Sequence, residues 1–151
     1  MLERSITIAA PVEEVFAFHL DTRNAAAIAP PEARVVRVEG EFPVREGALV
    51  GMWMRPAPLA PAQEWRVRVA EVDPPTRLVD VAERSPFAEW RHEHLFRPLG
   101  DGRTEMTDRV TYRPPLGPLG GLADRILVGR LLERTFRIRQ ERTRAALEGG
   151  P

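Results

Sequence analysis

Two histidines and one aspartate stand out because a single β-hairpin would bring them together. If the segment from Phe87 to Tyr112 folds as a hairpin, alternate residues of each strand share one face. From the first strand, that face receives Trp90, His92, His94 and Phe96. From the second strand, it receives Met106, Asp108, Val110 and Tyr112. A face that mixes aromatic and titratable side chains is unusual for a purely structural core.

The register of this hairpin follows from its turn. We expect a three-residue loop at 100–102, with Leu99 paired to Arg103. Phe96 then lies opposite Met106, Trp90 opposite Tyr112, and His94 opposite Asp108. This register predicts an imidazole-carboxylate pair surrounded by large apolar side chains, an arrangement typical of a lined pocket.

The pair formed by His94 and Asp108 has two interpretations. In the first, Asp108 orients the imidazole and His94 exchanges a proton with an enolisable or hydroxylated ligand. In the second, the pair is structural: it fixes the hairpin register and anchors one ligand oxygen. Tyr112 is also a candidate, since its phenol can donate to a carbonyl or simply pack against Trp90.

A metal site is a third reading of the same residues. His92, His94 and Asp108 together would supply three ligands for zinc or iron. The chain has no cysteine, and it has no HExxH motif. We therefore expect no metal and no cofactor.

The ligand pocket is predicted to extend beyond the hairpin. Trp53 and Trp65 offer large flat surfaces to a hydrophobic or ring-containing ligand. Pairing through Ser85-Pro86 would turn Val79 and Val81 toward the same interior. The expected ligand-binding set is Trp53, Trp65, Val79, Val81, Trp90, His92, His94, Phe96, Met106, Asp108, Val110, Tyr112, Leu122 and Ile126.

Composition narrows the class of protein. The 151 residues suit one domain, residues 1–151, and the formal net charge is +0, which does not favour nucleic acid as a partner. Without cysteine, disulfides and thiolate chemistry are excluded. No apolar run is long enough to span a bilayer, so we expect a cytoplasmic protein without stable membrane insertion.

The order of elements can be read from periodicity and turn signals. A short strand at 5–9 precedes a helix that begins near Pro11 and a second short helix that ends at Pro30-Pro31. Period-two segments between 34 and 113 predict an antiparallel meander, with a bulge at 70–72. From Val128 onward the period is helical, which predicts a long amphipathic terminal helix with a bend or a change of neighbour at Gly129.

This order resembles the helix-grip fold of the START-like superfamily, also called SRPBCC or polyketide cyclase/dehydrase-like. The local segments that carry the resemblance are 8–16, 21–24 with Pro30-Pro31, 90–96, 106–112 with 115–120, and 132–136. The resemblance implies an α+β fold in which a curved antiparallel sheet of six to seven strands wraps around a long C-terminal helix. It also implies two short helices after the first strand.

Members of this superfamily hold lipids, polyketides, quinones or plant hormones in a cavity between the sheet and the helix. The resemblance therefore implies that this chain binds or carries a small hydrophobic molecule, and we expect binding rather than turnover. Because a shared fold does not fix a reaction, two alternatives stay open. One is an enzyme of the cyclase, aromatase or dehydratase kind that uses His94 and Asp108. The other is a protein-interaction module whose partner the sequence does not identify.

Overall fold

The computed structural model describes residues 1–31, 33–56, 59–114 and 122–149. Its elements follow the expected order. Two helices, α1 (Val12–Leu20) and α2 (Asn24–Ile28), come directly after strand β1 (Leu2–Ile8). The remaining strands are β2 (Arg34–Glu39), β3 (Leu49–Arg55), β4 (Gln63–Asp73), β5 (Arg77–Arg84), β6 (Glu89–Gly100) and β7 (Arg103–Arg113). The chain then forms one long helix, α3 (Leu122–Glu148).

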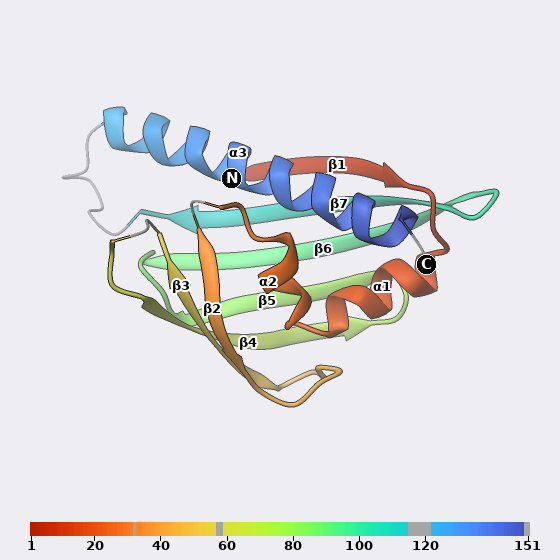
Figure 1. Ribbon diagram of the computed structural model, residues 1–151, viewed down its shortest axis with the longest axis horizontal. Helices are drawn as coiled ribbons and strands as arrows, with labels where there is room; N and C mark the ends of the chain where they lie inside the picture. Colours follow the sequence, from red (N-terminus) through yellow and green to blue (C-terminus); the bar gives the residue numbers. More distant parts are fainter. Residues whose placement is uncertain (32, 57–58, 115–121, 150–151) are drawn as a thin grey trace.

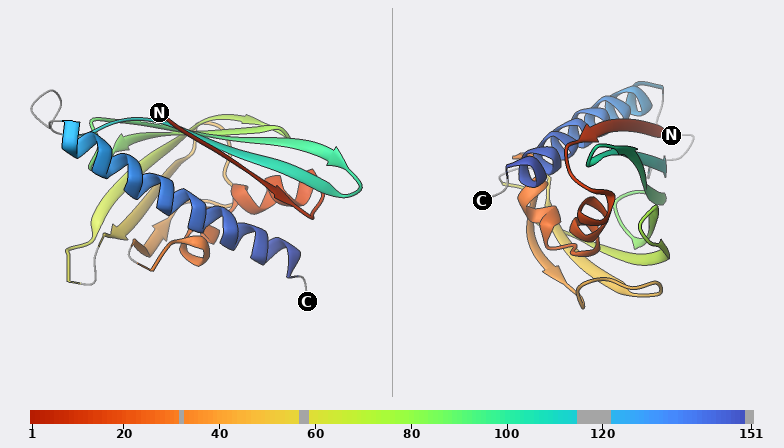
Figure 2. Two further views of the ribbon diagram at one scale, coloured as in Figure 1. Left: turned by 90° about the horizontal axis from the view of Figure 1, so that it is seen from above. Right: turned by 90° about the vertical axis from the view of Figure 1, so that its right-hand side faces the viewer.

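The seven strands form one antiparallel sheet in the order β1-β7-β6-β5-β4-β3-β2. The sheet curves, and the three helices lie on its concave side (Figure 1). Helix α3 crosses that side diagonally, while α1 and α2 cover the part of the sheet that α3 leaves open (Figure 2). This is the helix-grip architecture that the sequence predicts, with seven strands.

The two short helices begin and end for local reasons. Pro11 stands immediately before α1, where a missing backbone N–H costs nothing, and Glu13 and Glu14 lie at the positive end of the helix dipole. Asp21 then separates the helices, because its carboxylate accepts the backbone N–H of Arg23. These local signals set the start of α1 and the break between the two helices.

The register of the β6–β7 hairpin is the predicted one. Phe96 pairs with Met106, His94 with Asp108, and Trp90 with Tyr112. The turn itself differs from the prediction. Gly100 pairs directly with Arg103, so the loop has two residues, and a bulge at Leu99 restores the register further along. Asp101 and Gly102 both have positive φ angles, as a tight two-residue hairpin turn requires.

The β5–β6 connection corrects a second prediction. Asp80 pairs with His92, and Leu78 with His94, so Leu78 and Asp80 share the concave face. Val79 and Val81 point to the opposite face, contrary to the expectation from a two-residue turn at Ser85-Pro86. The connection is longer than two residues, since it runs from residue 85 to 88, and within it Ser85 Oγ accepts the backbone N–H of Phe87. A shift of one residue in register exchanges the two faces of a strand.

The bulge predicted in β4 is present, since the register against β5 shifts between Val69 and Glu71. Helix α3 is one helix that continues through Gly129. Among the described residues, no helix combines the length and the apolar character needed to cross a membrane.

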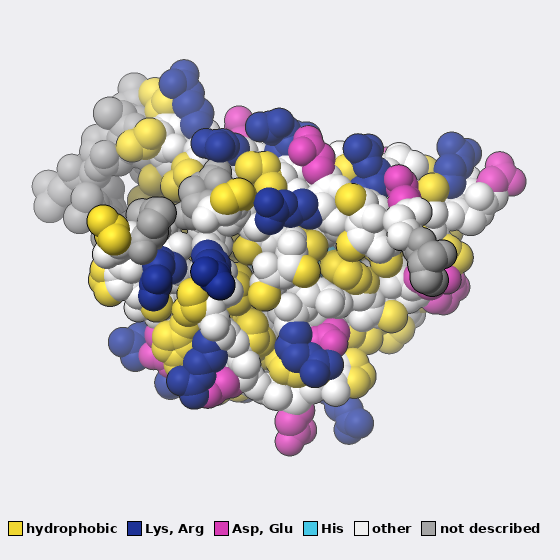
Figure 3. Space-filling model, in the orientation of Figure 1, with side chains coloured by type: hydrophobic (Ala, Val, Ile, Leu, Met, Phe, Trp, Pro, Cys, Tyr) yellow, Lys and Arg dark blue, Asp and Glu magenta, His cyan; other side chains and the backbone are white. Residues whose placement is uncertain are grey.

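Helix α3 has a buried side and a solvent side. Its most buried side chains are Leu132, Phe136, Gln140 and Thr143, which follow helical spacing. Leu131, although apolar and next to Leu132, is 53% exposed. Arginine side chains are spread along the outer surface of the helix (Figure 3). The helix is therefore amphipathic, as predicted, with its apolar side toward the sheet.

Two clusters of buried apolar residues hold the layers together. One lies beneath α1, where Val15 and Phe16 pack with Phe96 and Met106. The other lies beneath α3, where Leu132 and Phe136 pack with Trp65, Trp90 and Val110. The candidate site lies between these two clusters.

Candidate functional site

A cavity of about 390 Å³ lies between the concave face of the sheet and the helices. Its wall draws on α1, α2, α3 and the five strands from β2 to β6. Cavities of this size commonly hold small organic molecules. The apolar part of the wall includes Ile28, Val35, Met52, Met54, Trp65, Phe87, Trp90, Leu131 and Leu132. Its titratable side chains are His19, Asp21, Asp80, His92, His94 and Arg139.

Asp108 lies at the centre of a buried polar network behind this wall. Its Oδ1 accepts from Nε2 of His92 at 2.8 Å and lies 3.1 Å from Nδ1 of His94. Nδ1 of His94 is not aligned for a full hydrogen bond, so this second contact is mainly electrostatic. Oδ2 of Asp108 accepts from the side-chain amide of Gln140 at 2.7 Å. One carboxylate therefore joins β6, β7 and α3.

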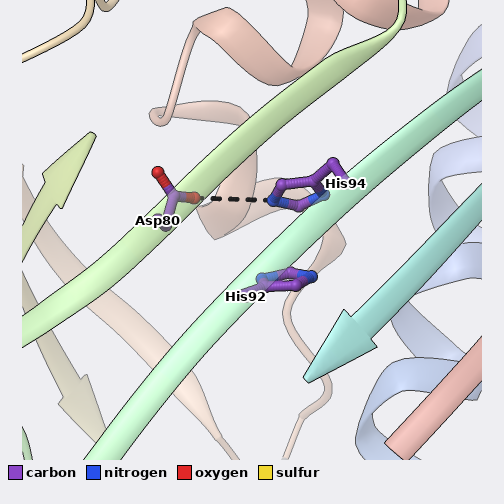
Figure 4. Close-up of side chains that lie close together, drawn as sticks. All are labelled: Asp80, His92 and His94. Carbon is purple, nitrogen blue, oxygen red and sulfur yellow. Dashed lines mark ion pairs between the residues drawn. The ribbon is translucent and has the colours of Figure 1, made fainter. Parts of the chain in front are cut away.

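Asp80 contacts the other edge of His94. Its Oδ2 lies 3.5 Å from His94 Nε2, across the neighbouring strand (Figure 4). His92 lies beside His94, and their ring centroids are 3.8 Å apart. His94 thus has a carboxylate at each of its two nitrogens.

These contacts divide the two imidazoles into a charged one and a neutral one. Burial opposes the charge on His94, but its contacts with Asp108 and Asp80 outweigh burial and raise its pKa to about 9. Burial and the adjacent charge of His94 lower the pKa of His92 to about 4. Burial alone would raise the pKa of Asp108, yet its contacts with both histidines hold that pKa well below its usual range. At neutral pH the site therefore holds a protonated His94, a neutral His92 and an ionised Asp108.

His19 adds a third imidazole from the end of α1. Its ring centroid lies 5.0 Å from that of His94, and its Nδ1 contacts the backbone carbonyl of Val15 at 2.7 Å. Burial and the charge of His94 lower the pKa of His19 to about 3. The neutral ring must donate from Nδ1 to that carbonyl, which leaves Nε2 as an acceptor.

Arg139 brings a positive charge to the same end of the cavity. Its guanidinium lies over the ring of Phe136, with Cζ 5.2 Å from the ring centroid. Burial lowers the pKa of Arg139, although the charges of Asp108 and Asp80 act in the opposite direction. The cavity end where β5, β6 and α3 meet is consequently polar and charged.

Three of these side chains also form a group with metal-ligand character. One potential ligand atom from each of Asp80, His92 and His94 lies within 4.8 Å of the others (Figure 4). The sequence pattern had suggested Asp108 as the carboxylate of such a group, but Asp108 lies behind the imidazoles. Two imidazoles and one carboxylate are a donor set that zinc or non-haem iron accepts.

Four of the residues expected from the sequence to bind ligand line the cavity. They are Trp65, Trp90, His92 and His94. Asp108 lies just behind them and contacts both histidines. The hairpin face therefore does contribute to a cavity wall.

The structure places the other expected residues elsewhere. Phe96, Met106 and Val110 are buried among other side chains of the two core clusters, and Val79 and Val81 point to the opposite face of the sheet. Trp53 also lies on that opposite face, where Arg37 stacks on its ring. Tyr112 packs against Trp90 and Phe87. Ile126 is 46% exposed, and the side chain of Leu122 falls outside the described part of the chain.

The main site residues missing from the sequence prediction are His19, Asp80, Arg139 and Gln140. Two of them carried a usable signal. Asp80 interrupts the apolar run from Leu78 to Ala82, and Gln140 follows the buried Phe136 by four residues on the same helix face. A polar residue at an apolar position often has a buried polar partner.

Comparison with known proteins gives a family match over residues 1–148. The matching family is described as polyketide cyclase / dehydrase and lipid transport. The match spans every element of the fold, from β1 to α3. No curated protein matches the chain in sequence.

Solved structures with the same fold are also found. One is the di-domain ARO/CYC BexL from the BE-7585A biosynthetic pathway, with a TM-score of 0.75 and 23% identity over 97% of this chain. The match spans 46% of that protein, which is about half of a two-domain chain. The protein TTHA0849 from Thermus thermophilus has a TM-score of 0.74 and 21% identity, with 98% of this chain and 97% of that chain covered. The steffimycin-pathway di-domain ARO/CYC StfQ gives a TM-score of 0.73 at 17% identity, with 98% of this chain and 50% of that chain covered.

Proposed function

The chain belongs to the polyketide cyclase / dehydrase and lipid transport family, and from this premise we propose that it binds or carries a small hydrophobic molecule inside its cavity. The observation that supports this proposal most strongly is the cavity itself. It is walled largely by apolar and aromatic side chains and has a small polar group at one end. That combination gives a ligand apolar contact area and a fixed orientation.

The aromatic wall suits a flat or chain-like ligand. Trp65 and Trp90 meet edge to face with their centroids 5.1 Å apart, and Phe87 packs against both. Met52 and Met54 contribute flexible thioethers from β3. Such a wall adapts to hydrophobic ligands of different shape, in keeping with the breadth of the family description.

A pair of variants on α2 tests this proposal. Ala25 lines the cavity, whereas the adjacent Ala26 is exposed and lies outside the lining. We expect Ala25→Phe to fill the cavity and abolish binding of dodecanamide and of 2-naphthamide, and Ala26→Phe to leave binding intact. Binding is followed by the fluorescence of Trp65 and Trp90 in a Trp53→Phe background, because Trp53 lies away from the cavity. Equal binding by the two variants, or no binding by the parent protein, would overturn the proposal.

A second candidate function is acid-base catalysis of the cyclase or dehydratase type, and one observation favours it. His94 lines the cavity, holds its proton at neutral pH, and has a carboxylate at each ring nitrogen. The Nε2 proton of this imidazolium lies 3.5 Å from Asp80, too far for a strong hydrogen bond, and can be donated to a ligand carbonyl. The neutral Nε2 of His19, which also lines the cavity, would accept the proton that leaves the α-carbon during enolisation. Asp108 would hold the ring in place during the transfer.

Enolisation can be measured directly on a simple diketone. We expect the protein to accelerate deuterium exchange at the central carbon of 1-phenylbutane-1,3-dione, followed by NMR in heavy water. His94→Gln should remove the acceleration but retain quenching of Trp65 and Trp90 by the diketone. Exchange at the buffer rate with the parent protein would leave binding as the function.

A further inference from the structure

Arg139 has no hydrogen-bond acceptor among the residues that the structure describes. Its guanidinium stacks over Phe136, with Cζ 5.2 Å from the ring centroid. Phe136 is itself buried, so its ring is a fixed apolar surface beneath the guanidinium. Arg139 forms part of the cavity wall. Its guanidinium is therefore available to a ligand or to solvent in the cavity.

The nearby carboxylates have other partners. Asp108 accepts from His92 and Gln140 and lies against His94. Asp80 lies 3.5 Å from the charged His94. Across the described part of the chain, neither carboxylate comes within ion-pair distance of Arg139. Both attract the guanidinium from further away, but neither contacts it directly.

A guanidinium that lines a cavity without a direct hydrogen-bond acceptor is costly for the protein by itself. Removing a charged group from water without pairing it is unfavourable unless acceptors replace the lost hydration. A planar guanidinium offers parallel N–H groups that match the two oxygens of a carboxylate. The cost of burying Arg139 is offset when a ligand brings such an anion.

We propose that the ligand of this cavity is an amphipathic organic acid whose carboxylate pairs with Arg139. This inference rests on the proposed function, because it names the class of molecule that the cavity takes. The acid group occupies the end of the cavity where Arg139, His94 and Asp80 meet. The rest of the molecule lies along the apolar wall.

The arrangement of side chains along two elements fixes this orientation. On α3, Leu132 lies about two turns before Arg139, and both line the cavity. On β6, Trp90 precedes His92 and His94 in the same direction. The cavity thus changes from apolar to charged along its length. A molecule with an apolar body and one acidic end matches that gradient.

Pairs of acids and amides separate charge recognition from hydrophobic binding. The probes are dodecanoate with dodecanamide, and 2-naphthoate with 2-naphthamide, measured by fluorescence of Trp65 and Trp90 in the Trp53→Phe background. We expect each acid to bind more tightly than its amide, and Arg139→Gln to weaken acid binding by about 10- to 150-fold. Amide binding should change little, which also shows that the cavity of the variant is intact.

Arg137 provides the matched control, since it lies on the same helix and its side chain is 50% exposed. Arg137→Gln should leave both acid and amide binding unchanged. If acids and amides bind equally and Arg139→Gln affects neither, the acidic ligand class is overturned while the proposed function stands. If the parent protein binds none of the four probes, the proposed function fails together with this inference.

Discussion

Gln140 donates its side-chain amide to Asp108 at 2.7 Å and to the backbone carbonyl of Arg4 at 2.9 Å. A single side chain of α3 therefore satisfies the central carboxylate of the site and a carbonyl of the edge strand β1. This contact couples the position of the helix to the geometry of the polar network.

Replacing Gln140 with Leu keeps the approximate size of the side chain but leaves both acceptors without their donor. We expect the free energy of unfolding to fall by about 1–3 kcal/mol, as is usual for buried acceptors that lose a partner. Urea unfolding measures the change. The adjacent Glu141 is exposed, so Glu141→Gln should change stability by less than about 0.5 kcal/mol. Equal effects of the two substitutions would show that the amide contacts contribute nothing to stability.

Asp108 controls the charge of His94. The contact at 3.1 Å favours the imidazolium, and Asp108→Asn removes that negative charge at nearly constant volume. We expect the pKa of His94 to fall from about 9, because burial then acts against Asp80 alone. NMR titration of the histidine rings measures the shift. An unchanged pKa in the variant would mean that Asp80 alone holds the proton.

The hairpin at the centre of the site could be predicted from sequence because its two strands alternate cleanly. Both apolar and titratable residues fell on one face, and the register followed from the position of the turn. The predicted loop was one residue too long, yet the bulge at Leu99 restored the predicted register of the strands. A register fixed by many side chains tolerates an error in a single loop residue.

Strand β5 could not be predicted in the same way, because its sequence allows two apolar faces. Val79 and Val81 make one apolar face, and Leu78 makes another that includes Asp80. The apolar pattern alone predicts that the face with Val79 and Val81, which has no acidic residue, points into the core. The folded chain turns Asp80 inward because His94 lies across from it as a buried cationic partner. Tertiary pairing of this kind is absent from the local pattern.

The polar residues of helix α3 were also hard to predict from the local sequence pattern. Arg139 is charged, so the amphipathic pattern assigns it to the solvent side, whereas the spacing of Gln140 from Phe136 puts a polar residue on the buried face. Gln140 lies inside because Asp108 and the edge strand require a donor, and Arg139 because it faces the cavity. The fold class follows from periodicity, whereas the composition of the polar end depends on contacts between distant elements.

The three histidines predict how stability depends on pH. The pKa of His94 is raised from 6.5 to about 9, so its contribution is complete below pH 6.5 and is lost as the pH rises through 9. The pKa values of His19 and His92 are lowered to about 3 and about 4, so the unfolded chain binds more protons at these residues below pH 6.5. Stability should therefore fall on both sides of an optimum near pH 6.5.

Urea unfolding between about pH 4 and 10 checks this profile. The variant His94→Gln should lose the decline above pH 6.5, because the group that releases the proton is gone. A parent profile that stays level from pH 6.5 to about 9 would contradict the assignment of a charged His94. Asp108 also contributes to the loss of stability at low pH. Because its pKa is lowered in the folded protein, its contribution to the free energy of unfolding is lost as the pH falls through that lowered pKa.

Leu131 and Leu132 provide a test of which side of α3 faces the sheet. Leu132 is 7% exposed and belongs to the core cluster with Trp65 and Phe136, whereas Leu131 is 53% exposed. We expect Leu132→Ala to cost about 2–4 kcal/mol in unfolding free energy, since it removes packed methyl groups and enlarges the cavity. Leu131→Ala should stay within about 0.5 kcal/mol. The two variants are compared by their denaturant midpoints at constant m-value. A larger loss of stability for Leu131→Ala than for Leu132→Ala would mean that the helix is rotated about its axis.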